Sequence, residues 1–174
     1  MNILILGLPG SGKTTLATKL SKKLGYEVVS FDTYRYGENW HKKDFDEFRT
    51  SVLSALNLST KPKIIETVYT DSDPVKARMR VVKELYPIFD KIYIIKPEPI
   101  EVVAAQLIDR CIERAILLDK GLPAVKERSQ DRAWLLITNI TMYEENVRTL
   151  LQDFDTDPKV VLLRRDDLTD YLGL

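Results

Sequence analysis

The sequence predicts an α/β fold, a three-layer α/β/α sandwich around a five-stranded parallel sheet. Short runs rich in Ile, Val and Leu alternate with longer segments of helical periodicity, which is typical of parallel strands joined by crossover helices. The strand candidates are mainly apolar, as expected of strands covered on both faces. With 174 residues, 44% of them apolar, the chain can form one compact core, so we expect a single domain over residues 1–174.

Five strands are expected, each at a short run of β-branched or other apolar residues. They are Asn2–Leu6, Glu27–Phe31, Lys63–Glu66, Lys91–Lys96 and Lys159–Leu163. The segments between them are long enough for the crossover connections that parallel strands require.

The first two helices are indicated by apolar spacing and by their stop signals. Thr14–Leu24 has a leucine at every fourth position from Leu16, and Gly25 ends it. A second helix is expected over Asp44–Leu58, where the turn-forming residues 59–62 follow.

Three more helices are expected after the third strand. One opens where Asp73 caps it and Pro74 takes the first helical position, and it runs to about Tyr86. The others are expected over about Ile100–Leu118 and about Val125–Phe154, and turn-forming residues follow both.

Composition excludes several classes of protein. The 26 Lys and Arg residues balance 26 Asp and Glu residues, so a nucleic-acid partner would need a local basic patch. The one cysteine, Cys111, excludes an internal disulfide framework, and the one histidine, His41, excludes a site with two imidazoles. No apolar run approaches the roughly 20 residues of a membrane helix, and the first residues lack the pattern of a signal peptide. We therefore expect a cytoplasmic protein with no membrane partner and no obligate protein partner.

The strongest motif follows the first expected strand. Residues 7–14 read Gly-Leu-Pro-Gly-Ser-Gly-Lys-Thr and match the Walker A pattern, Gly-x-x-x-x-Gly-Lys-Ser/Thr, at every fixed position. A strand before the motif and an amphipathic helix after it provide the required context. The alternative is an ordinary glycine-rich turn.

Each residue type in this loop has a physical role in holding a polyphosphate. The glycines let backbone N–H groups approach the phosphates, and the following helix adds the positive end of its dipole. The Lys13 ammonium can reach the β- and γ-phosphates, and the Thr14 hydroxyl can hold Mg²⁺. We expect ATP or GTP with Mg²⁺ as ligands, ATP being favoured. The expected nucleotide-binding residues are Gly7, Leu8, Pro9, Gly10, Ser11, Gly12, Lys13, Thr14 and Thr15.

Two other classes of protein that contain Walker A loops are not supported by this sequence. A guanine-specific switch needs Asn/Thr-Lys-x-Asp after a later strand, whereas residues 60–63 lack the Asp and precede the third strand. A motor-type ATPase needs an apolar strand ending in Asp-Glu, whereas the third and fourth strands are followed by Thr67 and Pro97.

The chain resembles the small P-loop kinases, the group that contains nucleoside monophosphate kinases and 5′-hydroxyl polynucleotide kinases. The Walker A loop carries the resemblance, together with Asp32-Thr33-Tyr34-Arg35 after the second strand and, more loosely, Phe48-x-Thr50 and Ile64-Ile65-Glu66. The resemblance implies the P-loop NTPase fold, with strand order 2-3-1-4-5 and a helical lid. It also implies that Asp32 takes the proton of an acceptor hydroxyl and that Arg35 steadies phosphate.

The expected sheet geometry places these groups together. In an open α/β sheet, ligands lie beyond the carboxyl ends of the strands, where the Walker A loop, Asp32 and Glu66 are expected. Asp32 would act as general base; the alternative is a turn-forming or helix-capping residue. Glu66 would hold the acceptor or a Mg²⁺-bound water; the alternative is a solvated strand end.

Arginines after the fourth strand are candidates for a lid that covers the transferred phosphate. Catalytic roles are expected for Arg110 and Arg114, an acceptor contact for Arg128, and a further contribution from Arg132, with the lid over about residues 115–130. The alternative is a solvated face with acidic partners, namely Asp109, Glu113 and Asp131.

Aromatic residues gather in the expected acceptor region, about residues 32–60. Tyr34, Tyr36 and Trp40 are candidates for stacking on a nucleobase, whereas Phe45 and Phe48 are expected in the core. His41 is expected at the surface. The alternative for the whole group is packing of a helix on the sheet.

A basic helix is expected after the third strand. It carries Lys76, Arg78, Arg80 and Lys83, which would follow a nucleic-acid backbone or form a solvated helix face.

These features predict an ATP- and Mg²⁺-dependent kinase. The acceptor would be a hydroxyl of a nucleoside, nucleotide or nucleic acid, a modified base in DNA included. One alternative is a nucleoside monophosphate kinase, whose phosphate acceptor has less need of a base. Another is a non-enzymatic nucleotide-binding switch module, in which only the Walker A loop would matter.

Overall fold

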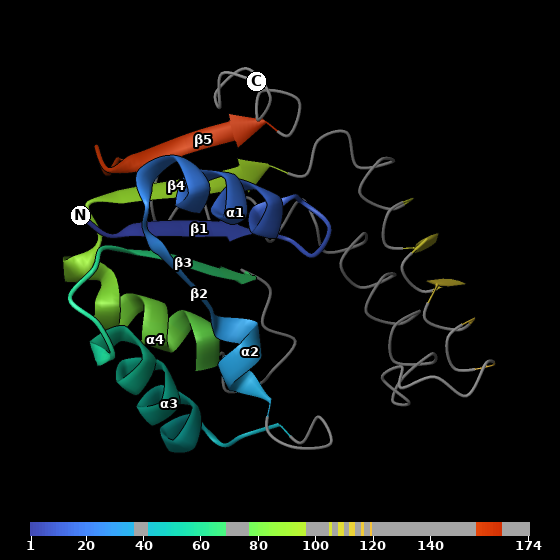
Figure 1. Cartoon of the computed structure of the whole chain (residues 1–174), viewed down its shortest axis with the longest axis horizontal. Coiled ribbons are helices and arrows are strands. Elements are labelled where there is room, and N and C mark those ends of the chain that lie inside the picture. The colour runs from blue at the N-terminus through green and yellow to red at the C-terminus, as the bar shows by residue number, and fades with distance from the viewer. Residues whose placement is uncertain are drawn as a thin grey trace.

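A computed structural model of the chain shows a parallel five-stranded sheet of order β2-β3-β1-β4-β5 (Figure 1). The structure describes residues 1–36, 42–68, 77–96 and 156–164, together with residues 105, 108, 109, 112, 113, 116 and 119. The strands are β1 (Ile3–Gly7), β2 (Glu27–Ser30), β3 (Lys63–Val68), β4 (Lys91–Lys96) and β5 (Val160–Arg164). The predicted α/β class and strand order are confirmed.

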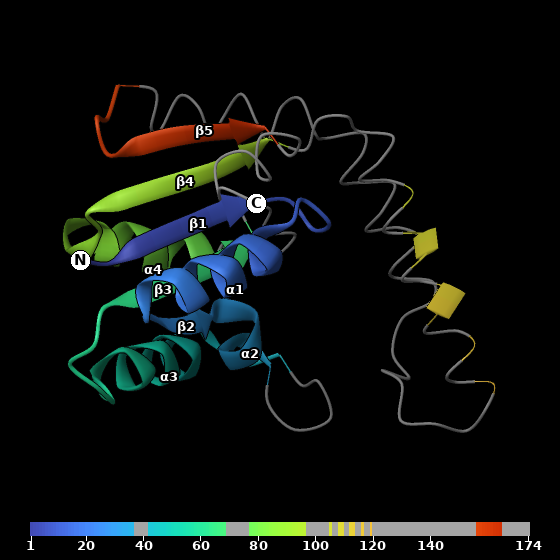
Figure 2. The same cartoon turned by 45° about the horizontal axis from the view of Figure 1, so that its top comes forward.

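Helices cover both faces of this sheet (Figures 1 and 2). They are α1 (Lys13–Leu24), α2 (Phe31–Arg35), α3 (Phe45–Asn57) and α4 (Ala77–Leu85), with a short 3₁₀ helix η2 (Tyr86–Ile88) after α4. Alternate side chains of β1 enter two cores: Ile3 and Ile5 pack with α1, and Leu4 and Leu6 pack with α3 and α4. This two-sided burial explains why the strand sequences are so apolar.

The structure corrects the ends of several elements. The second strand stops at Ser30, one residue before its predicted end, and Phe31 opens the unpredicted helix α2. Phe31 is fully buried, and its ring packs edge-on against the Phe48 ring with 5.8 Å between the ring centres. The apolar residue that suggested a strand therefore belongs to the core as part of a helix. β3 extends to Val68 because its last residues pair with the end of β1.

Other predicted helices fall partly or wholly outside the described residues. α4 is described from Ala77, so its predicted start at Asp73 and Pro74 is not described. Within the predicted helix over about residues 100–118, the described positions 105, 108, 109, 112, 113 and 116 are helical. The predicted helix over about residues 125–154 lies outside the described residues. In the described part of the chain, no helix has the length and apolar character needed to cross a membrane.

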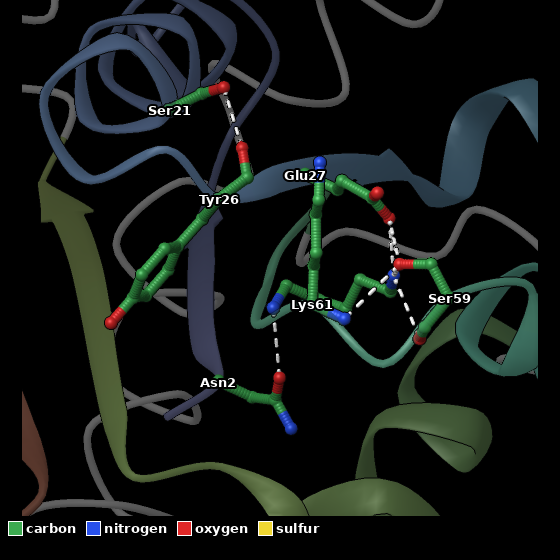
Figure 3. A network of polar contacts seen from close by, with 7 residues as sticks. Asn2, Ser21, Tyr26, Glu27, Ser59 and Lys61 are labelled. Atoms are coloured by element: carbon green, nitrogen blue, oxygen red, sulfur yellow. Dashed lines mark hydrogen bonds and ion pairs between the residues drawn. The ribbon is translucent and has the colours of Figure 1, made fainter.

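A network of polar side chains ties together the amino ends of β2 and β3 (Figure 3). Lys63 is buried, and its Nζ donates hydrogen bonds to the Glu27 carboxylate and to Ser59 Oγ, the latter at 2.7 Å. The Asn2 side chain accepts the backbone N–H of Lys63 at 2.9 Å. Because an ammonium is costly to bury without a partner, Glu27 is the group that permits Lys63 to lie inside.

This network makes folding stability sensitive to acid. The hydrogen bond from Lys63, followed by that from Ser59, holds the pKa of Glu27 below its ordinary value of 4.5. The stabilisation is therefore present above that ordinary value and is lost as the pH falls through the lower pKa of the folded state. We expect Glu27→Gln to lower the urea midpoint at pH 7 and to lower it less at acid pH. The double variant Glu27→Gln/Lys63→Met removes the buried ammonium as well and should be the more stable of the two; equal midpoints would contradict this role of Glu27.

Candidate active site

The loop between β1 and α1 has the backbone that a phosphate-binding site requires. Gly10 and Gly12 adopt φ angles of 81° and 93°, a region that side chains disfavour. Gly7 is needed for space: a Cβ there would lie 2.5 Å from Ser11 Oγ and 3.2 Å from the carbonyl oxygen of Ile95. The loop ends at Gly12, which caps α1, so the N-terminus of that helix opens onto the site.

Two side chains within the loop are suited to an anionic ligand. Lys13 is only 7% exposed, and its Nζ donates a hydrogen bond of 2.8 Å to the carbonyl oxygen of Leu8. Ser11 is fully buried, and its Oγ has no hydrogen-bond partner among the described residues. A buried hydroxyl without a partner is costly, and a phosphate oxygen would satisfy it. These residues therefore fit the predicted polyphosphate.

Thr14 and Glu66 meet at the end of the loop. The Thr14 hydroxyl lies 3.2 and 3.3 Å from the two carboxylate oxygens of Glu66, which is 6% exposed and comes from β3. The alternative of a solvated strand end for Glu66 is therefore wrong. Hydroxyl and carboxylate oxygens suit Mg²⁺, which usually keeps several waters and shares phosphate oxygens rather than filling a protein cage. No group of three or more acidic, His or Cys side chains that could hold a metal occurs among the described residues.

Asp32 lies in the first turn of α2, directly after β2. Ser30, the last residue of β2, is in register with Glu66 on β3, so the chain passes to Asp32 beside the strand that carries Glu66. The Asp32 carboxylate is half exposed, and its Oδ1 accepts a hydrogen bond of 2.9 Å from Arg78 Nε. The predictions did not include this partner, because no local signal in the sequence connects α2 with α4.

Arg35, for which a phosphate contact is expected, is buried at the junction of α2 and α3. It is 3% exposed, its Nη1 donates a hydrogen bond to the carbonyl oxygen of Lys43, and its guanidinium lies 5.5 Å from the centre of the Phe48 ring. These contacts tie α2 to α3. The catalytic role of Arg35 stays a prediction, which its burial does not favour.

The predicted aromatic cluster serves mainly as packing where it is described. Phe48 is fully buried, while Phe45 and Tyr34 pack against the same core from its edge. The guanidinium carbon of Arg78 lies over the Tyr36 ring, 5.9 Å from the ring centre. Trp40 and His41 lie outside the described residues.

The lid arginines are likewise not described: Arg110, Arg114, Arg128 and Arg132 lie outside the described part of the chain. Within the predicted lid over about residues 115–130, only positions 116 and 119 are described, and both are helical.

The basic helix is confirmed as α4, but its side chains do not share one face. Arg78 is 7% exposed and turns to Asp32, so the solvated alternative is wrong for this residue. Arg80 is exposed and lies 3.7 Å above the Phe45 ring, and Lys83 is exposed. Lys76 is not described. The buried position of Arg78 removes it from any track that a nucleic-acid backbone would follow along this helix.

The loop geometry makes Lys13 the decisive cation for nucleotide binding. We expect Lys13→Ala to weaken ATP affinity about tenfold to a hundredfold, since hydrogen bonds to charged groups contribute about 1.5–3 kcal/mol. Isothermal titration calorimetry measures this, and Lys22→Ala, at an exposed position of the same helix, is the control. Equal affinity in the two variants would contradict the assignment of the loop.

Glu66 should contribute to the metal dependence of nucleotide binding. In thermal unfolding, Mg²⁺ with ATP should stabilise the protein more than ATP with a chelator, and this difference should shrink in Glu66→Gln. The amide keeps the size of the buried side chain while removing its charge. Glu47→Gln, at an exposed position of α3, should retain the full difference. An unchanged difference in Glu66→Gln would show that Glu66 has no part in holding Mg²⁺.

Comparison with known proteins finds a family model, a curated relative and solved structures that this chain resembles. The family model described as an AAA domain matches residues 3–84. The "Putative adenylate kinase" of Sulfurisphaera tokodaii is 29% identical over 103 residues, which are 57% of this chain and 50% of that protein. The chain thus spans about half the length of this curated relative.

Solved structures extend the likeness to nearly the whole chain. A gluconokinase from Sinorhizobium meliloti 1021 is similar over 99% of this chain and 87% of its own, with a TM-score of 0.54 and 17% identity. A sugar kinase from Janibacter sp. HTCC2649 is similar over 98% and 88%, with a TM-score of 0.51 and 17% identity. At this identity the likeness concerns the fold. Together with the Walker A loop and the sheet order, these findings confirm the predicted resemblance: the chain has the fold and the nucleotide-binding motif of the small P-loop kinases.

Proposed function

We propose that this protein is an ATP- and Mg²⁺-dependent kinase that transfers the γ-phosphate to a hydroxyl group. The observation that carries the proposal is the position of Asp32, a half-exposed carboxylate that follows β2 beside the strand of Glu66. Glu66 in turn contacts Thr14 of the Walker A loop. The two groups thus lie at the same edge of one sheet, where ligands of open α/β sheets bind, and this supports the proposal.

The residues divide the chemistry between them. The loop amides, Lys13 and Ser11 would hold the phosphates of ATP, and Thr14 with Glu66 would hold Mg²⁺, which when bound offsets phosphate charge. The acceptor oxygen attacks the γ-phosphorus and forms the new O–P bond. The bond to the β–γ bridging oxygen breaks, and ADP leaves with the electron pair. The proton of the acceptor hydroxyl passes to the Asp32 carboxylate.

The acceptor is proposed only as a hydroxyl compound. Nucleosides, nucleotides and nucleic acids stay the predicted acceptors, and the names of the two structural neighbours add sugars and sugar acids to the compounds worth testing. The inward position of Arg78 favours a small acceptor over a nucleic-acid strand along α4.

A second candidate is a nucleoside monophosphate kinase. It is favoured by the name of the curated relative, "Putative adenylate kinase". The acceptor of a nucleoside monophosphate kinase is a phosphate group. Such an acceptor needs no general base, so the contribution of Asp32 separates the two candidates.

The direct test is transfer from γ-labelled ATP to a panel of acceptors. The panel contains nucleosides, nucleoside monophosphates, DNA and RNA 5′ ends, modified-base DNA, and small sugars and sugar acids. Labelling of a hydroxyl compound supports the proposal, and labelling of monophosphates alone supports the second candidate. No transfer to any acceptor, with nucleotide-dependent binding of another protein, would indicate a switch module instead.

Asp32→Asn should lower turnover with the hydroxyl acceptor roughly a hundredfold, because general bases contribute about 10²–10⁴-fold. ATP affinity should be unchanged, since Asp32 lies outside the Walker A loop. Asp46→Asn is a matched control, because Asp46 is exposed in the first turn of α3 as Asp32 is in that of α2. Near-normal turnover in Asp32→Asn would remove the general base from the mechanism.

A further inference from the structure

Arg78 stands out among the described residues because it is a buried cation directed at the proposed general base. Its side chain is 8% exposed and its Nε lies 2.9 Å from Asp32 Oδ1. The two residues are 46 positions apart in sequence and belong to different helices, α4 and α2. The contact therefore depends on the tertiary fold.

The burial of the two partners is unequal. The Asp32 side chain is 49% exposed, whereas its partner is nearly enclosed. A half-exposed aspartate has several rotamers available, and a hydrogen bond from a fixed donor selects one of them. In this pair the arginine is the anchor and the aspartate is the group held in place.

The position of Arg78 is itself supported from two sides. Its neighbours Ala77 and Met79 are buried in the core under α4. Its guanidinium carbon lies 5.9 Å from the centre of the Tyr36 ring. Tyr36 follows α2, and its backbone forms an antiparallel bridge with that of Lys42. This bridge fixes the backbone position from which the Tyr36 ring extends. Arg78 is thus held between the core and the segment that carries Asp32.

The two oxygens of Asp32 have different roles in this geometry. Oδ1 accepts the hydrogen bond from Arg78, whereas Oδ2 makes no hydrogen bond within the described residues. An oxygen that already accepts from a guanidinium is the poorer proton acceptor, and the other oxygen stays available. The pair therefore presents one defined oxygen to an incoming hydroxyl.

We propose that Arg78 is a positioning residue for phosphoryl transfer: it holds Asp32 by Oδ1 so that Oδ2 takes the acceptor proton. This inference rests on the proposed function and adds a residue to it. We assign Arg78 neither binding of the phosphates nor uptake of the proton. Its contribution is orientation, and a displacement of about 1 Å can cost roughly a hundredfold in rate.

The test compares Arg78→Gln, Asp32→Asn and the double variant, with γ-labelled ATP and the acceptor that the wild type labels best in the panel. Arg78→Gln should lower kcat roughly tenfold to a hundredfold and leave the KM for ATP within about twofold. The double variant should be no slower than Asp32→Asn alone, because the two residues act as one unit. Lys22→Gln, at an exposed position of α1, should keep wild-type kinetics.

A merely structural role for Arg78 gives different results. It predicts a weaker ATP affinity by calorimetry, and losses of kcat that multiply in the double variant. Either result overturns the inference, as does normal turnover in Arg78→Gln. If Arg78→Gln fails to fold, Arg78→Lys retains a cation; it should show a smaller loss of kcat that disappears in the Asp32→Asn background.

The inference and the proposed function can fail separately. A wild-type protein that labels no hydroxyl acceptor removes the proposed function, and the role of Arg78 with it. A wild-type protein that labels an acceptor, together with an Arg78→Gln variant of equal turnover, removes the role of Arg78 alone.

Discussion

The alignment of parallel strands is the constraint on which the site depends. Gly7 at the end of β1 is in register with Val68 of β3, and Glu66 of β3 is in register with Ser30 of β2. This pairing brings the Walker A loop, Glu66 and the start of α2 to one edge of the sheet, although they are far apart in the sequence. A shift of one residue in β3 would turn Glu66 to the opposite face and break its contact with Thr14.

The two edges of the sheet use charge in different ways. At the amino edge, the buried Lys63 is enclosed by Glu27 and Ser59, so its charge is offset within the chain and serves stability. At the carboxyl edge, the buried Lys13 donates a hydrogen bond to the carbonyl oxygen of Leu8, and the buried Ser11 hydroxyl has no hydrogen-bond partner among the described residues. A phosphate oxygen would satisfy that hydroxyl, so the charge at this edge is suited to a ligand.

Sequence predicted the parts of this protein that local patterns encode. The Walker A loop is continuous, and the strands β1, β3 and β4 are apolar runs bounded by turns, so their positions are confirmed with small changes at their ends. The helix α2 was missed because a buried apolar residue such as Phe31 is equally compatible with the end of a strand and with the start of a helix. The inward turn of Arg78 was missed for a different reason: it depends on how α4 lies against α2, which periodicity does not report.

Two buried arginines, Arg35 and Arg78, show which contacts a sequence motif does not predict. Arg35 and Arg78 both lie near Asp32, and the motif assigned the phosphate contact to Arg35, three residues after Asp32. In the folded chain Arg35 joins α2 to α3 through the carbonyl oxygen of Lys43, and its phosphate contact stays a prediction. Arg78, which the motif does not contain, makes the contact with Asp32. A sequence motif fixes the spacing along one helix, but the partner of a carboxylate is chosen by the packing of separate helices. For this reason the orientation of a general base can depend on a residue that no local signature contains.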